Sequence, residues 1–510
     1  MGLRNGLGGG DPDPGTIVTS RAGANNDSRE SFSRRQGREN LLQWWEEIDF
    51  LGSFAGEGRA GVDLAIASEN ERGFGHAGLQ NEDPLTAHGT QCAQTVKRAE
   101  IKKRTDLAGN PCAASVLALS LSNSIFTLKL FSITMSDYAK GLEGVIANES
   151  ALSKVEGLDG RLSYLGYSID DLVENCTYEE VVHLLHRGKL PNADELAALE
   201  NTLRNDREIP QGVIDFLKAA PKDANPMDVL RTGVSMLGLY DDRAKIGEPD
   251  QDANREVALA LVAQTPVIVA YFHRARQGLD LPPVRTDLSE AGHFLYLMSG
   301  EEPSEAATKT LDIAYILHAD HGMNASTFSS RVTVATLSDF YSAVTSAIGT
   351  LKGPLHGGAN EGVIKMLQEI GDLDKVDAYV EDCLANKKKI MGIGHRVYKV
   401  LDPRAPHLQK MAIKLTEELG EAKWIKMSER IATMMRERKG LNANVDFYSA
   451  TVYYSLNIPT DLFTPIFAIS RMSGWAAQVL EQLEDNRLYR PLTKYVGPAE
   501  LSPVTPIAER

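Results

Sequence analysis

Apolar residues at helical spacing run through almost all of the chain beyond Met135, and this pattern constrains the fold more than any other feature. Thr177–Glu180 forms a capping box, in which a threonine hydroxyl and a glutamate carboxylate accept hydrogen bonds from free amides at a helix start. Apolar residues follow within 181–185, and Gly188 ends the pattern. Alternating strand patterns flanked by hairpin turns are almost absent. The sequence therefore predicts an all-α fold.

Further helix starts follow the same logic. Asn192 and Ser338 are predicted N-caps, since short polar side chains accept hydrogen bonds from the first amides of a helix. Leucines recur at helical spacing after Asn192, and residues 343–351 repeat the pattern after Ser338. A chain of 510 residues exceeds what one hydrophobic core usually serves, so we expect two or more domains.

Residues 1–134 differ in character from the rest of the chain. They hold 17 of the 43 glycines and show little sustained periodicity. Such polar, glycine-rich sequence buries too little apolar area to offset its conformational entropy. We therefore expect either a disordered extension or a segment upstream of a true start at Met135.

Charge and composition exclude several classes of protein. The formal net charge of -15 argues against a general nucleic-acid binder, which needs clustered Lys and Arg. The four cysteines form no CxxC pair, which predicts neither a disulfide framework nor a zinc site and fits a reducing compartment. The most apolar stretch, residues 113–134, is broken by polar residues, and the first residues lack a secretory signal. We expect a cytoplasmic protein without a membrane partner.

Four short stretches interrupt the helical pattern, and each places a histidine or an aspartate among small residues. They are GPLHGGAN at residues 353–360, MGIGHRVYKVLDPR at 391–404, NVDFYS at 444–449 and HADHGMNAST at 318–327. Glycines and prolines around His356 and His395 predict tight turns in which backbone approaches a ligand closely. These turns are the candidate functional sites.

The residues alone leave the reaction open. A lone histidine in a helical protein is more often a structural residue than a catalyst. His318 and His321 have a spacing that suits a metal, but no third ligand stands at a recognisable spacing. GIGHRV lacks the preceding strand and final glycine of a dinucleotide-binding loop, and GPLHGGAN lacks the Lys-Ser/Thr of a phosphate-binding loop.

The order and separation of GPLHGGAN, GIGHRVYKVLDPR and NVDFYS resemble the citrate synthase family. The resemblance extends from about Gly141 to Pro491 and includes GLDGRLSYLGYSIDDL (157–172) and EEVVHLLHRGKLPN (179–192). It implies a two-domain helical fold. The large domain would comprise residues 135–356 and 452–510, and a small closing domain residues 357–451.

The resemblance also implies the chemistry, which condenses acetyl-CoA with oxaloacetate and needs no permanently bound cofactor and no metal. Asp446 would be the base that removes a proton from the thioester methyl group. His356 would donate a hydrogen bond to the thioester oxygen as charge develops there. His395 would polarise the ketone of oxaloacetate and supply its proton.

The same resemblance implies the residues that bind the substrates. Arg404 and Arg471 would bind the carboxylates of oxaloacetate, because planar guanidinium groups suit carboxylates. His321 would contact the oxo acid, although Gly322 follows it where the family commonly has an acidic residue. Arg490 would reach the active site of the neighbouring subunit, which implies a homodimer. The adenine end of CoA would lie along Lys389, Ile390, Met391 and Gly392.

Two alternatives remain at this point. A 2-methylcitrate synthase uses the same residues with propionyl-CoA, and one methylene in an apolar pocket is worth only about 1–3 kcal/mol of discrimination. A non-catalytic CoA-binding homologue would keep the fold without the reaction. The motifs do not settle assembly beyond a dimer or regulation by NADH or ATP.

Overall fold

The computed structural model describes residues 138–243, 250–418, 420 and 422–510. The extension predicted for residues 1–134 lies outside the described residues, so that expectation stays a prediction. The described residues belong to one compact unit, which begins at Thr134.

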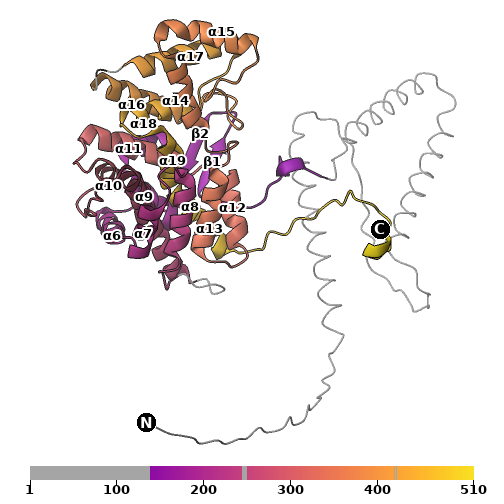
Figure 1. Ribbon diagram of the computed structural model, residues 1–510. Coiled ribbons are helices and arrows are strands. Elements are labelled where there is room, and N and C mark those ends of the chain that lie inside the picture. The colour runs from indigo at the N-terminus through magenta and orange to yellow at the C-terminus, as the bar shows by residue number, and fades with distance from the viewer. Residues whose placement is uncertain (1–137, 244–249, 419, 421) are drawn as a thin grey trace, which may run out of the picture. The chain divides into compact units, whose positions relative to one another are not determined.

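Helices dominate the described chain, which confirms the predicted all-α class (Figure 1). The α-helices are α4 (Ile169–Asn175), α5 (Tyr178–Arg187), α6 (Ala193–Asn205), α7 (Gln211–Ala219), α8 (Pro226–Leu237), α9 (Gln251–Gln277), α10 (Glu290–Ser299), α11 (Glu305–His318), α12 (Ala325–Val334), α13 (Phe340–Leu351), α14 (Ala359–Ile370), α15 (Val376–Ala385), α16 (Ala405–Glu418), α17 (Lys423–Lys439), α18 (Val445–Ser455) and α19 (Phe463–Glu484). Short 3-10 turns occur at Lys140–Leu142, Leu373–Lys375, Thr460–Leu462 and Ile507–Glu509.

The predicted caps are correct at two helices and wrong at a third. Thr177 N donates to Glu180 at 2.7 Å and Glu180 N donates to Thr177 Oγ1 at 3.3 Å, so the capping box forms as expected. Asn192 also caps its helix. Ser338 does not. Helix α13 starts one residue later, where Asp339 accepts a hydrogen bond from Ser342 N at 2.8 Å. A carboxylate has the advantage there of a negative charge at the positive end of the helix dipole.

A small antiparallel sheet is the feature that the sequence analysis missed. Strands β1 (Ser153–Glu156), β2 (Arg161–Tyr164) and β3 (Tyr167–Ser168) pair in that order, with Ser153 opposite Tyr164. The strands have at most four residues, which is too short for alternation to stand out from a helical pattern. The turn at residues 157–160 closes with Gly160 in the left-handed region, at φ 66°.

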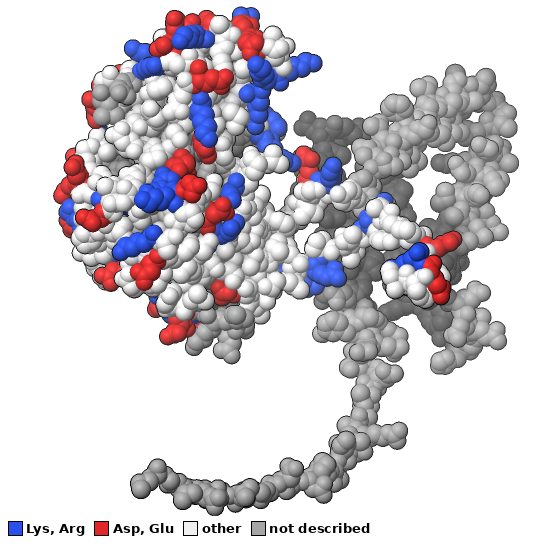
Figure 2. All heavy atoms as spheres, in the orientation of Figure 1, with Lys and Arg blue, Asp and Glu red and all other residues white. Residues whose placement is uncertain are grey.

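Two long helices form the centre of the fold. α19 is buried along most of its length and packs against α5, α9, α11 and α12. α9 is long and apolar enough to cross a membrane by length and composition, but 89% of its most apolar window is buried inside the protein. This burial is what a core helix requires. On the face shown in Figure 2, acidic and basic side chains are interspersed.

Helices α14 to α18 pack mainly on one another and gather at one end of the helical body in Figure 1. α16 and α14 also contact α11 and α19, respectively. The predicted small domain, residues 357–451, contains α14 to α17 and the first part of α18. The division into a large and a small domain stays a prediction.

A buried ion pair supplies a test of the packing. Arg207 Nη2 lies 2.6 Å from Glu290 Oε1, and both side chains are almost completely buried. We expect Arg207→Met to lower the free energy of unfolding by about 3–5 kcal/mol, because it leaves an uncompensated charge in the interior. The measurement is urea unfolding followed by circular dichroism.

The matched control is Arg204→Met. Arg204 pairs with Glu200 at 3.0 Å in a more accessible position, where an ion pair contributes about 0–1 kcal/mol. Equal losses of stability in the two variants would contradict the importance of the buried pair.

Candidate active site

His356 lies in a tight turn between α13 and α14. His356 N donates to Gly353 O at 2.9 Å, which closes the turn. A Cβ atom on the next residue, Gly357, would lie 2.4 Å from Leu351 O, so only glycine fits there. The glycines of the motif thus allow the chain to fold back tightly at the end of α13 and to present the imidazole.

The hydrogen bonds of His356 determine which ring nitrogen carries the proton. Ser326 N lies 3.3 Å and Ser326 Oγ 2.8 Å from His356 Nε2, and Trp475 Nε1 donates to the same hydroxyl at 3.1 Å. A backbone amide can only donate, so Nε2 is the acceptor and the neutral ring carries its proton on Nδ1. Burial lowers the pKa of His356 to about 4, helped by the positive charge of Arg471. At neutral pH His356 is therefore a neutral donor.

His395 is oriented in a similar way by its own loop. Val397 N and Tyr398 N each donate to His395 Nδ1 at 3.0 Å. Nδ1 is thus an acceptor and Nε2 carries the proton. Burial, followed by the charge of Arg404, lowers the pKa of His395. His395 is a second neutral donor, with its proton on the nitrogen opposite the loop.

His321 joins this cluster. Its ring centroid lies 5.7 Å from that of His395, and its Nε2 lies 3.1 Å from Tyr398 Oη. Burial and the nearby charges of Arg404 and Arg471 hold the pKa of His321 well below its usual range. The structure therefore brings His321 and His395, which are predicted to contact the same substrate, into ring contact.

Arg404 is buried and paired with Asp402. Its Nε and Nη2 atoms lie 2.9 and 2.8 Å from the two carboxylate oxygens, a bidentate pair. Burial acts to raise the pKa of Asp402, but Arg404 outweighs it and the pKa is lowered. Asp402 Oδ2 also accepts a hydrogen bond from Val445 N at 3.2 Å, directly before Asp446. This pair connects the His395 loop to the start of α18.

Arg471 is also buried but has few partners. Its Nε donates to His318 O at 2.5 Å, and its guanidinium lies 4.8 Å from the centroid of the Phe467 ring. Burial lowers its pKa to about 10, so it remains charged at neutral pH. Its two terminal nitrogens make no hydrogen bond to the described residues, which leaves them able to bind an anion.

Asp446 lies in the first turn of α18, where Asn444 accepts a hydrogen bond from Asp446 N at 3.0 Å. Asn444 also donates to Gly394 O at 2.8 Å through its side chain and to Gly392 O at 2.9 Å through its amide. No described residue donates a hydrogen bond to the Asp446 carboxylate. Burial raises its pKa to about 6, against the opposing charge of Arg404. It is a carboxylate suited to act as a base near neutral pH.

The remaining predicted residues have more varied positions. Lys389 is exposed and Ile390 is buried, while Met391 packs against Gly362. Gly392 has φ 73°, which favours glycine. Beyond them a cavity of about 210 Å³ is lined by residues of 394–402 and 440–443, including His395 and Lys399. Residues 389–392 therefore directly precede the loop that carries His395 and lines this cavity.

Arg490 is the predicted site residue that this chain does not bring to the cluster. It is exposed in the C-terminal segment and donates to Pro491 O at 3.4 Å. Its predicted action in a neighbouring subunit stays a prediction.

The alternative of a metal pair at His318 and His321 finds no support. His318 Nδ1 contacts Ala314 O at 2.7 Å, and its ring lies against Phe467. Within residues 138–510, apart from the masked positions, no group of three His, Cys, Asp or Glu side chains is placed to hold a metal ion.

Sequence reasoning missed the residues that orient the site. Ser326, Tyr398 and Asn444 hold His356, His321 and Asp446, respectively. All three lie in the stretches that interrupt the helical pattern, and this position was the available signal. Their residue types alone do not indicate that they orient other side chains.

Comparisons with known proteins agree with this geometry. Residues 141–492 match the family model described as citrate synthase, C-terminal domain. Citrate synthase 2 of Bacillus subtilis is 51% identical over 372 residues, which cover 73% of this chain and 99% of that protein. The chain belongs to the citrate synthase family. The 2-methylcitrate synthase 2 of Corynebacterium glutamicum is 42% identical over 384 residues, covering 74% of this chain and all of that protein.

Solved structures of the family share the fold. The citrate synthase of Pyrobaculum aerophilum superposes with a TM-score of 0.69 at 37% identity, covering 73% of this chain and 95% of that one. The citrate synthase of Thermoplasma acidophilum was solved as a ternary complex with carboxymethyl coenzyme A and oxaloacetate. It also gives a TM-score of 0.69, at 34% identity, covering 73% of this chain and all of that one.

The raised pKa of Asp446 predicts how stability depends on pH. Between the ordinary value of 3.8 and about 6, the unfolded chain loses its proton while the folded chain keeps it, so this group makes folding less favourable as pH rises. We expect Asp446→Asn to be more stable than the wild type above pH 6, by roughly 2–3 kcal/mol at most. The difference should vanish below pH 4.

The measurement is urea unfolding of both proteins between pH 4 and 8. Asp485→Asn, at the exposed end of α19, is the control for replacing a carboxylate by an amide at the surface. A stability difference for Asp446→Asn that is constant over this range would contradict the burial-raised pKa.

Proposed function

We propose that this chain is a citrate synthase, which condenses acetyl-CoA with oxaloacetate and water to form citrate and CoA. The observation that carries the proposal is two neutral histidines, each with its proton directed by backbone amides, in one buried site with the carboxylate of Asp446. Arg404 acts electrostatically on both His395 and Asp446, and Arg471 on both His356 and Asp446. The relatives named citrate synthase, at 46–51% identity, support the same reaction.

The first step makes a carbon nucleophile. The Asp446 carboxylate removes a proton from the methyl group of acetyl-CoA, and the electron pair moves onto the thioester oxygen. His356 donates a hydrogen bond from Nδ1 to that oxygen. The neutral imidazole acts as a hydrogen-bond donor that is already in place when negative charge develops on the thioester oxygen.

The second step forms the carbon–carbon bond. The methylene carbon of the enolate attacks the ketone carbon of oxaloacetate, and the ketone oxygen becomes a hydroxyl by taking the proton from His395 Nε2. Water then cleaves the thioester of the product, which releases citrate, the CoA thiol and a proton. Transfer of the proton held by Asp446 to His395, directly or through solvent, restores both residues before the next turnover.

The charges of the cluster suit a dicarboxylate substrate. Arg404 uses Nε and Nη2 on Asp402, which leaves Nη1 for a ligand, and Arg471 has both terminal nitrogens available. His321, neutral and beside His395, adds a third polar contact. A buried guanidinium group that is already hydrogen-bonded loses little side-chain entropy when it binds a carboxylate.

CoA would lie along the segment that leads into the His395 loop. We place its adenine end along Lys389, Ile390, Met391 and Gly392, next to the cavity that Lys399 and His395 line. The lysine run at 387–389 supplies positive charge for the phosphates. Closure of residues 357–451 over the rest of the chain would exclude water during the reaction.

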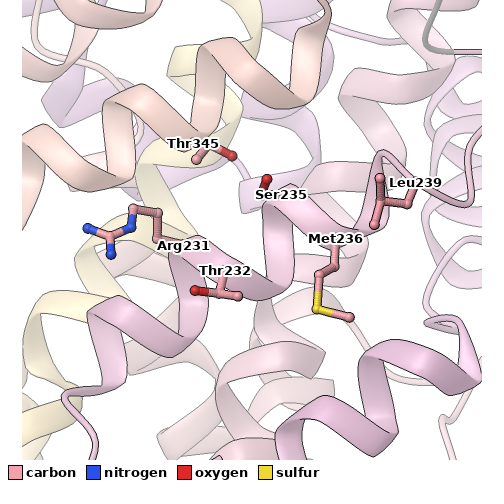
Figure 3. Close-up of a pocket in the computed structure, with 6 residues that line it drawn as sticks. All are labelled: Arg231, Thr232, Ser235, Met236, Leu239 and Thr345. Carbon is pink, nitrogen blue, oxygen red and sulfur yellow. The ribbon is translucent and has the colours of Figure 1, made fainter.

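A homodimer completes the proposal, with Arg490 acting in the partner subunit. A groove of about 270 Å³ between α8 and α13 supports a second copy on this face (Figure 3). Thr345 Oγ1 in this groove is buried without a hydrogen-bond partner, and Leu239 at its edge is 79% exposed. The C-terminal segment adds exposed apolar residues, among them Leu492 and Leu501.

A thiol-release assay tests the reaction. With oxaloacetate, we expect the wild type to release CoA from acetyl-CoA, with kcat/KM falling as the pH drops below about 6, because Asp446 must be ionised. Asp446→Asn should lower kcat by about 10²–10⁴-fold, the usual contribution of a general base. Absence of thiol release from any acyl-CoA would sink the enzyme proposal in favour of a CoA-binding homologue.

The same assay with propionyl-CoA addresses the second candidate, which the 42% identical 2-methylcitrate synthases favour. A kcat/KM that is higher for propionyl-CoA than for acetyl-CoA would assign 2-methylcitrate synthesis to the chain.

Mixed dimers test the role of Arg490. Arg490→Ala and Asp446→Asn should each be nearly inactive alone. In a mixed dimer, one site combines an intact Asp446 with the intact Arg490 of the other chain, so co-expression should restore activity. If Arg490 acts within its own chain, no intact site forms and the mixture stays inactive. Arg487→Ala, another exposed arginine of this segment, serves as the control.

A further inference from the structure

The hairpin of β1 and β2 contacts two parts of the active site that are far apart in the sequence. At its base, Ser153 Oγ donates to Asp320 Oδ2 at 2.5 Å and accepts from Gly322 N at 2.8 Å. His321 lies between these two residues. Strand β1 therefore holds both chain neighbours of the histidine that contacts His395.

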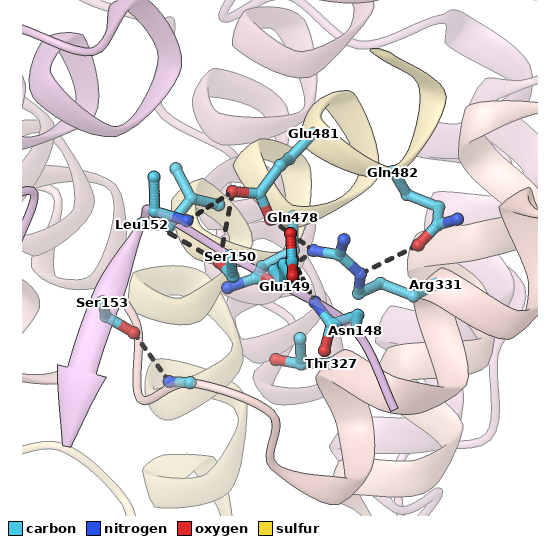
Figure 4. A network of polar contacts seen from close by, with 12 residues as sticks. Asn148, Glu149, Ser150, Leu152, Ser153, Thr327, Arg331, Gln478, Glu481 and Gln482 are labelled. Carbon is cyan, nitrogen blue, oxygen red and sulfur yellow. Dashed lines mark hydrogen bonds and ion pairs between the residues drawn. The ribbon is translucent and has the colours of Figure 1, made fainter. Parts of the chain in front are cut away.

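The base of the hairpin is fixed to the helical body by a polar network (Figure 4). Ser150 Oγ donates to Glu481 at 3.2 Å, and Arg331 Nη1 contacts Glu481 at 2.7 Å and Gln478 at 2.6 Å. Gln478 in turn donates to Asp320 at 3.2 Å. α12, α19 and the hairpin thus share one set of contacts that ends on the residue before His321.

The tip of the hairpin contacts the loop of His395. Gly157 O accepts a hydrogen bond from Lys399 N at 2.9 Å. A Cβ atom on Gly157 would lie 2.5 Å from Val397 O, a backbone atom that cannot move without moving the loop. Val397 and Tyr398 are the residues whose amides hold His395 Nδ1. The position of the tip therefore determines the orientation of the His395 ring.

Core packing does not account for this close approach. Leu158, at the centre of the turn, is 78% exposed, so the tip buries little apolar surface. The glycine is needed because the hairpin backbone lies directly against the backbone of the loop. The contact joins the main chain around His321 to the main chain around His395.

We propose that the β1–β2 hairpin is a strut that sets the relative position of His321 and His395, with Ser153 and Gly157 as positioning residues. The inference rests on the proposed function, because these two histidines are the groups that would contact the ketone substrate. Ser153 and Gly157 would align the substrate indirectly, through the two histidines, without contacting the substrate themselves.

The tip is tested with Gly157→Ala in the full-length chain. Displacement of the loop should lower kcat by about tenfold to a hundredfold, as misplacement of a reacting group by about 1 Å does. The KM for oxaloacetate should rise as well, because His321 and His395 are the groups that would contact this substrate. Leu158→Ala, on the same turn, is the control and should match the wild type. Wild-type kcat in Gly157→Ala would overturn the role of the tip.

The base is tested with Ser153→Ala, a change that leaves the backbone free to fold. We expect the KM for oxaloacetate to rise by about fivefold, the equivalent of one ordinary hydrogen bond, with the KM for acetyl-CoA unchanged. Ser163→Ala, on β2 and without a side-chain hydrogen bond in the described chain, is the control. An unchanged KM for oxaloacetate in Ser153→Ala would overturn the role of the base.

Hydrogen exchange separates this inference from the proposed function. The Lys399 amide, protected by Gly157 O, should exchange at least about tenfold faster in Gly157→Ala than in the wild type or in Leu158→Ala. This measurement needs no enzyme activity. A wild type without thiol release would contradict the proposed reaction alone. A Lys399 amide that exchanges as slowly in Gly157→Ala as in the wild type would contradict the positioning role of the hairpin.

Discussion

The buried pair of Asp402 and Arg404 is the interaction on which the rest of the site depends. Both side chains are removed from water and satisfy each other through two hydrogen bonds. Asp402 also accepts a hydrogen bond from the amide of Val445, so the same carboxylate connects the start of α18, which carries Asp446, to the His395 loop. Removing either partner would leave an uncompensated charge in the interior, which costs about 3–5 kcal/mol of stability.

The charge of Arg404 also determines the protonation of its neighbours. It lowers the pKa of His395 and His321 and opposes the rise that burial causes at Asp446. A cation near histidines favours their neutral forms, and a cation near a carboxylate favours the ionised form. One guanidinium thus favours the state that the chemistry needs at each of these groups, two neutral rings and one carboxylate.

The sequence predicts the helices better than it predicts the site. The capping box at Thr177 and the N-cap at Asn192 are local, because the interacting groups lie three residues apart, and both form as expected. The hairpin escaped prediction because its strands have at most four residues, too few for alternation to show. The ring contact between His321 and His395 joins residues more than 70 positions apart, which spacing cannot reveal. Asp446 shows why resemblance was needed: its raised pKa comes from burial, and burial is a property of the fold.

The groups left unsatisfied in the site also indicate what it is built to bind. Arg471 is charged and buried with one hydrogen bond, and no described residue donates to the Asp446 carboxylate. Each arrangement costs stability in the free protein, because a charge has lost water without gaining full compensation. Under the proposed function, a dianionic substrate would supply partners to Arg471 and to the Nη1 atom that Arg404 leaves free, so part of its binding free energy would come from relieving this desolvation. That anion would give no donor to Asp446, and the carboxylate would keep the basicity that proton removal requires.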